Sequence, residues 1–273
     1  MRAWRWLAPA VVVLLVVTAW PIGRAVWLSL TSRPLTSPDD RSFVGVDNYV
    51  DVLSSRTWWL AVAATLIIVV AVVALQLVLG MAFAAALRRL TVLWPVTRIL
   101  VLLPFGLLAV VSAVVWRDAV TTGFASAWFR LDDVGPLGQL VAVSLGEVWR
   151  GTGITAVILL AGLHRVPSAL MASAVADGAT ARQRFTRVVL PAMGPAIAVA
   201  VTYRSLDALR ILEGPLLVDE PGATVRTVPF LVWDTTFSSF ELGLGATMSI
   251  VLLLLSGLVA AFLVPVVRVR RVL

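Results

Sequence analysis

The chain has 273 residues, of which 60% are hydrophobic and only 14% are charged, and its formal net charge is +7. A soluble domain carries about 25% charged residues, so this composition indicates an integral membrane protein and not a soluble enzyme. The chain has no cysteine, which excludes disulfides, thiolate metal sites and cysteine nucleophiles. In a membrane protein a positive net charge reports basic cytoplasmic loops, and we expect no nucleic-acid partner.

Six apolar segments are long enough to cross a bilayer as helices, which takes roughly 20 residues each. They do not alternate between apolar and polar residues, as the strands of a barrel would. Since no internal repeat is visible, we expect one all-α membrane domain over residues 1–273. The predicted spans are Leu7–Leu30, Trp58–Leu87, Ile99–Trp116, Leu140–Leu163, Pro191–Leu212 and Leu242–Val267.

The first apolar segment has two interpretations. Arg2 and Arg5 precede it, and residues 17–19 resemble the cleavage site of a signal peptide. The apolar character resumes over Ala25–Leu30, so we expect a retained first helix. The polar segment that follows it is rich in Pro, Asp and Ser, and it predicts an ordered external loop with a short helix at Val46–Leu53.

Twelve of the chain's 22 arginines lie on one side of the predicted bundle, and the other side has fewer. The twelve are Arg2, Arg5, Arg88, Arg89, Arg98, Arg165, Arg182, Arg184, Arg187, Arg268, Arg270 and Arg271. The other side carries most of the acids, namely Asp39, Asp40, Asp47, Asp51, Asp118, Asp132, Asp133, Asp219, Glu220, Asp234 and Glu241. The positive-inside rule therefore places both termini and the loop between the fourth and fifth spans in the cytoplasm. This is the pattern of a multi-pass membrane protein.

The cytoplasmic loop Met171–Pro195 has an organised sequence. It predicts a short helix at about Ser168–Val175, a turn at Gly178, where glycine can take backbone angles closed to other residues, and a second helix over Arg182–Val189 that stops near Pro191. Such a helix–turn–helix could dock on a partner protein, or it could only cover the ends of the spans. The apolar positions that would fill a groove on a partner are Leu170, Met171, Phe185 and Val188.

The predicted fourth and fifth spans each carry more than one charged residue. A charge inside a span costs roughly 2.5–3.5 kcal/mol on insertion scales and normally faces protein or a water-filled cavity. Glu147 and Arg150 share one face of the fourth span because they are three residues apart. Arg204, Asp207 and Arg210 are spaced likewise along the fifth span.

Other signals argue against catalysis in this chain. It has no lysine, so it cannot form a phosphate-binding P-loop, and ATP would have to be hydrolysed by another polypeptide. His164 is the only histidine, and a capping or loop contact is favoured over a metal site there. Asp132 and Asp133 lack the further ligand spacing of a calcium loop. We expect no catalytic residue, no metal site and no cofactor.

The cytoplasmic loop resembles the segment by which permeases of ATP-binding cassette (ABC) importers dock on their ATPase subunit. The family pattern is Glu-Ala-Ala, a short gap, Asp-Gly-Ala, an aromatic residue, and Leu-Pro ahead of a second Pro. The matching residues are Ala172, Ser173, Ala174, Asp177, Gly178, Ala179, Phe185, Leu190, Pro191 and Pro195. Ala172 occupies the position of the family glutamate.

The resemblance covers essentially the whole chain. Residues 20–22, 27–30, 43–49 and 102–104 are similar to sugar permeases related to the larger maltose-importer subunit. Residues 147–150 and 203–210 look closest to the permease of the mycobacterial trehalose importer. The resemblance implies an all-α fold with six transmembrane helices, the type I ABC importer permease fold, and a cytoplasmic coupling helix within a coupling loop at 164–190.

The resemblance also implies a function and a set of partners. The chain would carry a sugar, with a disaccharide expected and trehalose as the leading candidate. It would work with a second permease, two ABC ATPase subunits that bind ATP and Mg²⁺, an extracytoplasmic sugar-binding protein, and membrane lipid. Related permeases use this part of the fifth span in the substrate site, which implies that role for Arg204 and Asp207, with Leu206 shaping the pocket.

The charged residues of the two spans then have two interpretations that can hold together. They could form an ion-pair network that locks the helices, or a polar lining that hydrogen-bonds sugar hydroxyls, with Trp149 or Tyr203 offering a ring face. Two other functional classes are alternatives to an importer permease. A membrane-embedded glycosyltransferase would need a carboxylate cluster, for which only Asp118, Asp132 and Asp133 offer themselves. A stand-alone secondary transporter would normally show internal repeats and broken helices.

Overall fold

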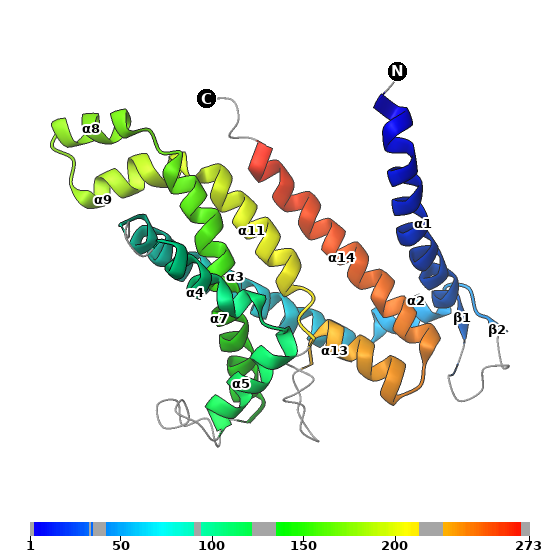
Figure 1. Ribbon diagram of the computed structural model, residues 1–273. Helices are drawn as coiled ribbons and strands as arrows, with labels where there is room; N and C mark the ends of the chain where they lie inside the picture. The colour runs from blue at the N-terminus through cyan, green and yellow to red at the C-terminus, as the bar shows by residue number, and fades with distance from the viewer. Residues whose placement is uncertain are drawn as a thin grey trace. The chain divides into compact units, whose positions relative to one another are not determined.

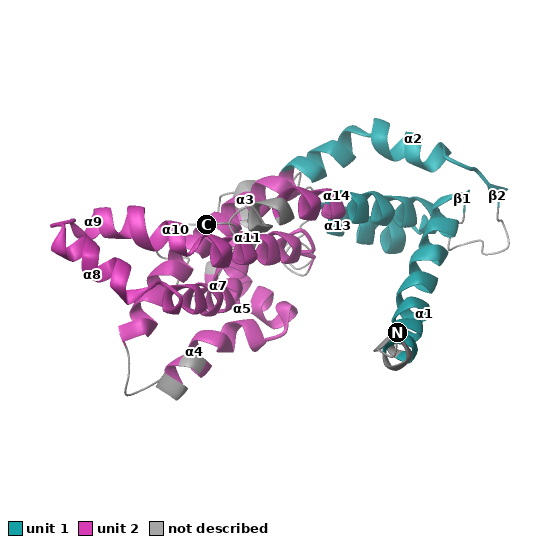
Figure 2. Cartoon of the chain, turned by 90° about the horizontal axis from the view of Figure 1, so that it is seen from above, with its two compact units in different colours: residues 1–63, 226–255 teal, residues 64–225, 256–273 magenta. Residues whose placement is uncertain are grey.

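The computed structural model describes residues 3–32, 34, 42–89, 94–121, 135–212 and 226–268, most of which are helical (Figure 1). The chain divides into two compact units (Figure 2). The first unit comprises residues 1–63 and 226–255, and the second comprises residues 64–225 and 256–273. Two long helices, α3 (Arg56–Arg89) and α14 (Leu242–Arg268), each contribute to both units.

The first unit combines segments from both ends of the sequence. Its other elements are α1 (Ala3–Ser29), β1 (Thr31–Ser32), β2 (Ser42–Phe43), α2 (Asp47–Ser54), α13 (Val228–Trp233) and the π-helical turn η3 (Asp234–Ser238). The two short strands pair antiparallel, with Thr31 opposite Phe43. Helix α2 confirms the short helix expected at Val46–Leu53. Helix α13 and the turn η3 lie outside the helices predicted from the sequence.

Polar side chains join three segments of the first unit. The amide of Asn48, at the start of α2, donates to the carbonyl oxygens of Ser29 and Thr31 at 2.9 and 3.1 Å. Thr247 of α14 donates to the same Ser29 carbonyl at 3.1 Å. The Ser29 hydroxyl lies 2.7 Å from the Tyr49 hydroxyl. The C-terminal end of α1 is therefore held by bonds from residues far away in the sequence.

The second unit is a helix bundle built around one central helix. This helix, α7 (Gly135–His164), contacts α4 (Trp94–Gly106), α5 (Ala109–Thr121) and α11 (Gly194–Ala208). Between α7 and α11 the chain forms four short elements: α8 (Ser168–Ala176), α9 (Ala181–Arg184), the π-helical turn η2 (Phe185–Val189) and α10 (Leu190–Ala192).

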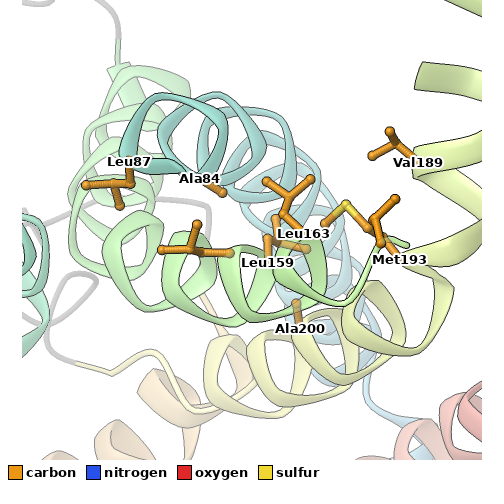
Figure 3. Close-up of a cluster of buried hydrophobic side chains, with 9 residues drawn as sticks. Ala84, Leu87, Leu159, Leu163, Val189, Met193 and Ala200 are labelled. Carbon is orange, nitrogen blue, oxygen red and sulfur yellow. The ribbon is translucent and has the colours of Figure 1, made fainter. Parts of the chain in front are cut away.

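An apolar core joins α3, α7 and α11 close to these short elements. Figure 3 shows Ala84 and Leu87 of α3 and Leu159 and Leu163 of α7 gathered with Val189, Met193 and Ala200. Each of these side chains is less than 9% exposed. The cluster therefore anchors the short elements to the ends of the long helices.

Among the described residues, three helices are long and apolar enough to cross a membrane, and there are up to six spans if each pair of helices joined at a sharp bend counts as one. That range accommodates the six predicted spans. The predicted first, second and sixth spans coincide with α1, α3 and α14.

The predicted third span, Ile99–Trp116, is not one straight helix. The chain bends by 96° between residues 99–106 and 109–119. Pro104 and Gly106 immediately precede the break, and both residue types are poor helix formers. The apolar composition of the segment predicted that its residues are helical. Composition alone did not predict the 96° bend between the two helices.

Candidate functional site

The segment between α7 and α11 forms a corner at each end. Residues 168–176 turn by 71° away from residues 144–164, and residues 181–192 meet residues 194–208 at 67°. Between the two arms, Gly178 has a φ of +74°, as the sequence predicts for a turn that requires glycine. Thr180 then starts the second arm with a capping box, in which its hydroxyl and the side chain of Gln183 satisfy each other's backbone N–H groups. We call residues 168–192 the docking segment.

The docking segment presents an uncovered apolar surface. Helix α8 has no buried residue. Leu170 is 54% exposed and Phe185 is 41% exposed, whereas Met171 packs against the apolar core. Exposed apolar side chains on an ordered element that no other described residue covers are typical of a docking surface. Five other residues predicted for this role are exposed or half-buried on the same segment, namely Ala172, Ala174, Asp177, Ala179 and Leu190.

The second arm ends near Pro191 as expected, with Ala192 as its last helical residue, so Pro191 itself lies inside the helical segment. A proline inside a helix lacks an N–H and clashes with the carbonyl four residues earlier. Here the preceding turn widens into a π-helix, in which the N–H of Leu190 bonds to the carbonyl of Phe185. The wider turn places Pro191 in the first turn of α10, where its missing N–H is tolerated.

A second group of predicted residues forms a buried ion cluster, which joins α3, α7 and α11. Arg150 holds the carboxylate of Glu147 through two nitrogens, each N···O distance being 3.0 Å. It also donates to Oδ2 of Asp207 at 3.1 Å. Arg204 donates to the same Asp207 oxygen, to Glu147, and through Nε to Oε1 of Gln76 at 2.8 Å. Gln76 donates to the backbone carbonyl of Glu147 at 2.8 Å.

The ion cluster has a closed side and a more open side. The side chain of Arg204 is 0% exposed and that of Glu147 is 9% exposed, whereas those of Arg150 and Asp207 are 15% and 31% exposed. Two arginines balance two carboxylates, so the cluster is neutral as a whole. Neutrality and complete pairing are what allow charges to be buried, because an unpaired buried charge costs several kcal/mol.

Gly151 makes the close packing of the ion cluster possible. A Cβ atom at this position would lie 2.2 Å from Nη2 of Arg204 and 2.2 Å from Nε2 of Gln76. Neither Gly151 nor Gln76 was predicted from the sequence to belong to this ion cluster. A signal for Gln76 was available, because it is the only amide side chain in the predicted second span. Gly151 gave no signal, since its role depends on which helix lies opposite.

The remaining predicted pathway residues lie outside these bonds. Trp149 lines an apolar cavity of about 510 Å³ together with Trp116, their rings 6.3 Å apart. Tyr203 is 41% exposed, and the guanidinium carbon of Arg204 lies 6.0 Å from its ring centre. Leu206 packs against an apolar cluster, and Arg210 is exposed just after α11.

The three residues considered for metal binding add no site. His164 is exposed at the end of α7, and Asp132 and Asp133 lie outside the described residues. No group of three His, Cys, Asp or Glu side chains within the described ranges is placed to hold a metal ion.

Comparison with known proteins identifies the family. The chain is 38% identical over 252 residues to the trehalose transport system permease protein SugA of Mycobacterium tuberculosis, which covers 90% of this chain and 82% of that protein. It is 29% identical over 276 residues to the trehalose/maltose transport system permease protein MalF of Thermococcus litoralis, with 97% and 92% covered. No family model matches the chain.

Solved structures of ABC transporters have a similar fold. A solved bacterial ABC transporter that imports the acidic polysaccharide alginate matches with a TM-score of 0.78 at 18% identity, covering 98% of this chain and 96% of that one. A methionine ABC transporter matches with a TM-score of 0.59. These likenesses favour neither a glycosyltransferase nor a stand-alone secondary transporter. The chain belongs to the permease family of ABC sugar importers, which are transport subunits of the membrane and not enzymes.

Proposed function

We propose that this chain is the permease subunit through which an ATP-driven importer moves a disaccharide, trehalose first among the candidates, into the cytoplasm. The choice of trehalose is supported by the relative with 38% identity over 90% of the chain, which is named for trehalose transport. The chain would work with a second permease, two ATPase subunits that bind ATP and Mg²⁺, and an extracytoplasmic sugar-binding protein. It would bind no cofactor itself.

The observation that carries the coupling role is the docking segment. It projects an uncovered apolar surface from a corner between α7 and α11, so a partner that grips it can pull on both helices. In the proposed cycle, ATP closes the ATPase pair, the docking segment carries that motion into the bundle, and the permease pair opens outward. Hydrolysis then returns the pathway to face inward. ATP and sugar shift the equilibrium because each would bind the two states with different affinity, and ATP hydrolysis gives the cycle its direction.

The substrate pathway is proposed to pass the open side of the ion cluster. Arg150 and Asp207 are the members that a ligand can reach, since Arg204 is fully buried and Glu147 nearly so. Arg204 would therefore act through Asp207 and not by touching sugar. Tyr203 and Arg210 are exposed along the same helix and its end and are proposed to line the pathway. Trp149 and Leu206 would contribute apolar walls.

Reconstitution tests the proposal. The tagged chain would be purified from its host and its co-purifying proteins identified, and the complex would then be placed in proteoliposomes with the sugar-binding protein and internal ATP. We expect a second permease and an ATPase to co-purify, and trehalose uptake to require ATP. Sugar uptake by this chain alone, driven by an ion gradient without ATP, would establish a secondary transporter instead. Uptake of maltose or sucrose in preference to trehalose would correct the substrate alone.

A further inference from the structure

The open side of the ion cluster pairs one donor with one acceptor. Arg150 uses Nε and Nη2 on the two carboxylates, and Asp207 uses only Oδ2 on the two arginines. Within the described residues Nη1 of Arg150 and Oδ1 of Asp207 have no partner, and neither atom is a buried polar atom left unsatisfied. These two atoms therefore form the edge that a ligand could reach.

A donor beside an acceptor matches a hydroxyl group better than an anion. A sugar hydroxyl both accepts and donates, so it can accept from Arg150 and donate to Asp207 at the same time. A carboxylate or phosphate only accepts when ionised. It would meet a single arm of Arg150, while the negative charge of Asp207 opposes it. The fork of an arginine binds anions strongly when N–H groups on two different nitrogens are free to form parallel bonds with them, and here, among the described residues, only Nη1 of Arg150 is free.

The buried side of the cluster keeps this edge fixed. Arg204 cannot turn toward a ligand, because Gln76, Glu147 and Asp207 hold its three nitrogens and Gly151 leaves no space above it. Phe105 lies beneath Arg150, with the guanidinium carbon 5.8 Å from the ring centre. Neither arginine can offer a free two-pronged cation without breaking a bond to a carboxylate.

From this geometry we infer that the Arg150–Asp207 edge is a selectivity site for uncharged saccharides, at which a hydroxyl bridges the two residues and an anionic sugar is rejected. The inference rests on the proposed function and makes it more specific: the charge of the substrate, and not only its size, is read by this chain. Asp207 is the residue that sets the preference, and Gln76 and Arg204 are positioning residues.

The test compares two ligands that differ in one group. Trehalose and an analogue with one hydroxymethyl group oxidised to a carboxylate would each be titrated onto the complete permease–ATPase complex in nanodiscs, without the sugar-binding protein, and weak binding would be followed by saturation-transfer NMR. We expect the wild type to bind trehalose at least tenfold more tightly than the acid. In Asp207→Asn the ratio should shift at least tenfold toward the acid, because the opposing charge is gone. Asp118→Asn removes a carboxylate from an exposed ion pair with Arg117 and should leave the ratio unchanged.

Equal affinity of the wild type for the two ligands, or an unchanged ratio in an assembled Asp207→Asn complex, would overturn the inference. Absence of binding by both ligands would also overturn it. If Asp207→Asn fails to assemble, the wild-type ratio alone decides. ATP-dependent trehalose uptake by the wild type tests the proposed function separately, so a transporter that carries trehalose but binds both ligands equally would refute only the selectivity site.

Discussion

Glu147 on α7 and Arg204 on α11 are joined by a direct hydrogen bond although 57 residues separate them in the chain. The whole docking segment lies between these two residues in the sequence. Their bond, reinforced by Arg150 and Asp207, therefore ties together the two helices from which the docking segment projects. A force applied to the docking segment reaches a pair of helices that are fixed to each other and not two independent ones.

The first prediction concerns the loss of Arg204. Arg204→Leu removes a fully buried cation, so Oε1 of Gln76 loses its donor and Arg150 alone remains to balance the carboxylates of Glu147 and Asp207. Breaking a buried ion pair in this way costs about 3–5 kcal/mol. We expect a clear fall in the melting temperature of the detergent-purified chain. The double variant Arg204→Leu with Asp207→Leu keeps the Arg150–Glu147 pair and should recover assembly, yet lose sugar uptake. Wild-type uptake by an assembled double variant would leave these residues a purely structural role.

The second prediction concerns the space above the ion cluster. Gly151→Ala would drive a methyl group into Arg204 and Gln76, and overpacking of this kind costs about 1–3 kcal/mol. Gly257→Ala is the matched control, because a Cβ at Gly257 of α14 meets nothing within 4 Å. It should be neutral or stabilising by up to about 1 kcal/mol. Thermal unfolding of the two variants side by side checks the difference, and equal stability would contradict it.

The third prediction concerns the turn of the docking segment. Gly178 has φ +74° and open space around it, so a substitution is opposed by backbone strain alone. A residue with a β-carbon pays about 1–2 kcal/mol in this conformation, and Asn tolerates it best. Gly178→Val should leave the protein in the membrane but uncouple it from the ATPase, whereas Gly178→Asn should retain most activity. Sugar-stimulated ATPase activity of the reconstituted complexes distinguishes them, and normal activity in the valine variant would refute the prediction.

The fourth prediction concerns the apolar surface of α8. Leu170→Glu places a charge where a partner is proposed to bury a side chain, so co-purification of the ATPase should fall at least tenfold. The fold should be unaffected because Leu170 is 54% exposed. Ser173→Ala, on the same helix, removes a hydroxyl that bonds only to the carbonyl of Ala169 and serves as the control. Undiminished recovery of the ATPase with Leu170→Glu would exclude this face from the interface.

The fifth prediction concerns topology. Leu263 near the end of α14 lines one cavity together with Leu190 and Gly194, so the last turns of α14 lie close to the docking segment. If that segment meets a cytoplasmic ATPase, the C-terminus is cytoplasmic too, in agreement with the arginines at 268–271. A fluorescent reporter fused at Leu273 should be active and a phosphatase reporter inactive. The reverse result would overturn the orientation.

The sequence predicted most of the helices but not their corners. Long apolar runs identified α1, α3 and α14, and the positions of Gly178 and Pro191 placed the docking segment to within a few residues. Helix α13 and the turn η3 were missed because VPFLVWDTTFS is too short for a span and mixes β-branched with polar residues, so neither length nor periodicity singled it out. Pro104 and Gly106 are local signals for the break that follows them, but the 96° angle between α4 and α5 depends on how both helices pack on α7.

The ion cluster was predictable in part for a similar reason. Residues three apart on one helix share a face, so Glu147 with Arg150 and Arg204 with Asp207 could be paired from spacing alone. The pairing between the helices, and the entry of Gln76 from α3, required the register of three helices relative to one another. We expected Trp149 to offer a ring face beside its charged neighbours. The Trp149 side chain instead lines an apolar cavity, because adjacent residues of a helix face different directions.

Helix α1 is attached at its end and uncovered along its shaft. None of the 18-residue window that qualifies it as a span is buried within the chain, whereas its last residue receives bonds from Asn48 and Thr247. In water this arrangement would expose a costly apolar surface. In a bilayer the lipid tails are as apolar as the side chains, so the uncovered shaft carries no penalty and a few polar bonds decide where the helix stays. The side chains of Asn48 and Thr247 thus fix one end of a helix that is uncovered along its shaft, and a substitution of Asn48 would affect the placement of the whole helix and not only the two carbonyl groups that it contacts.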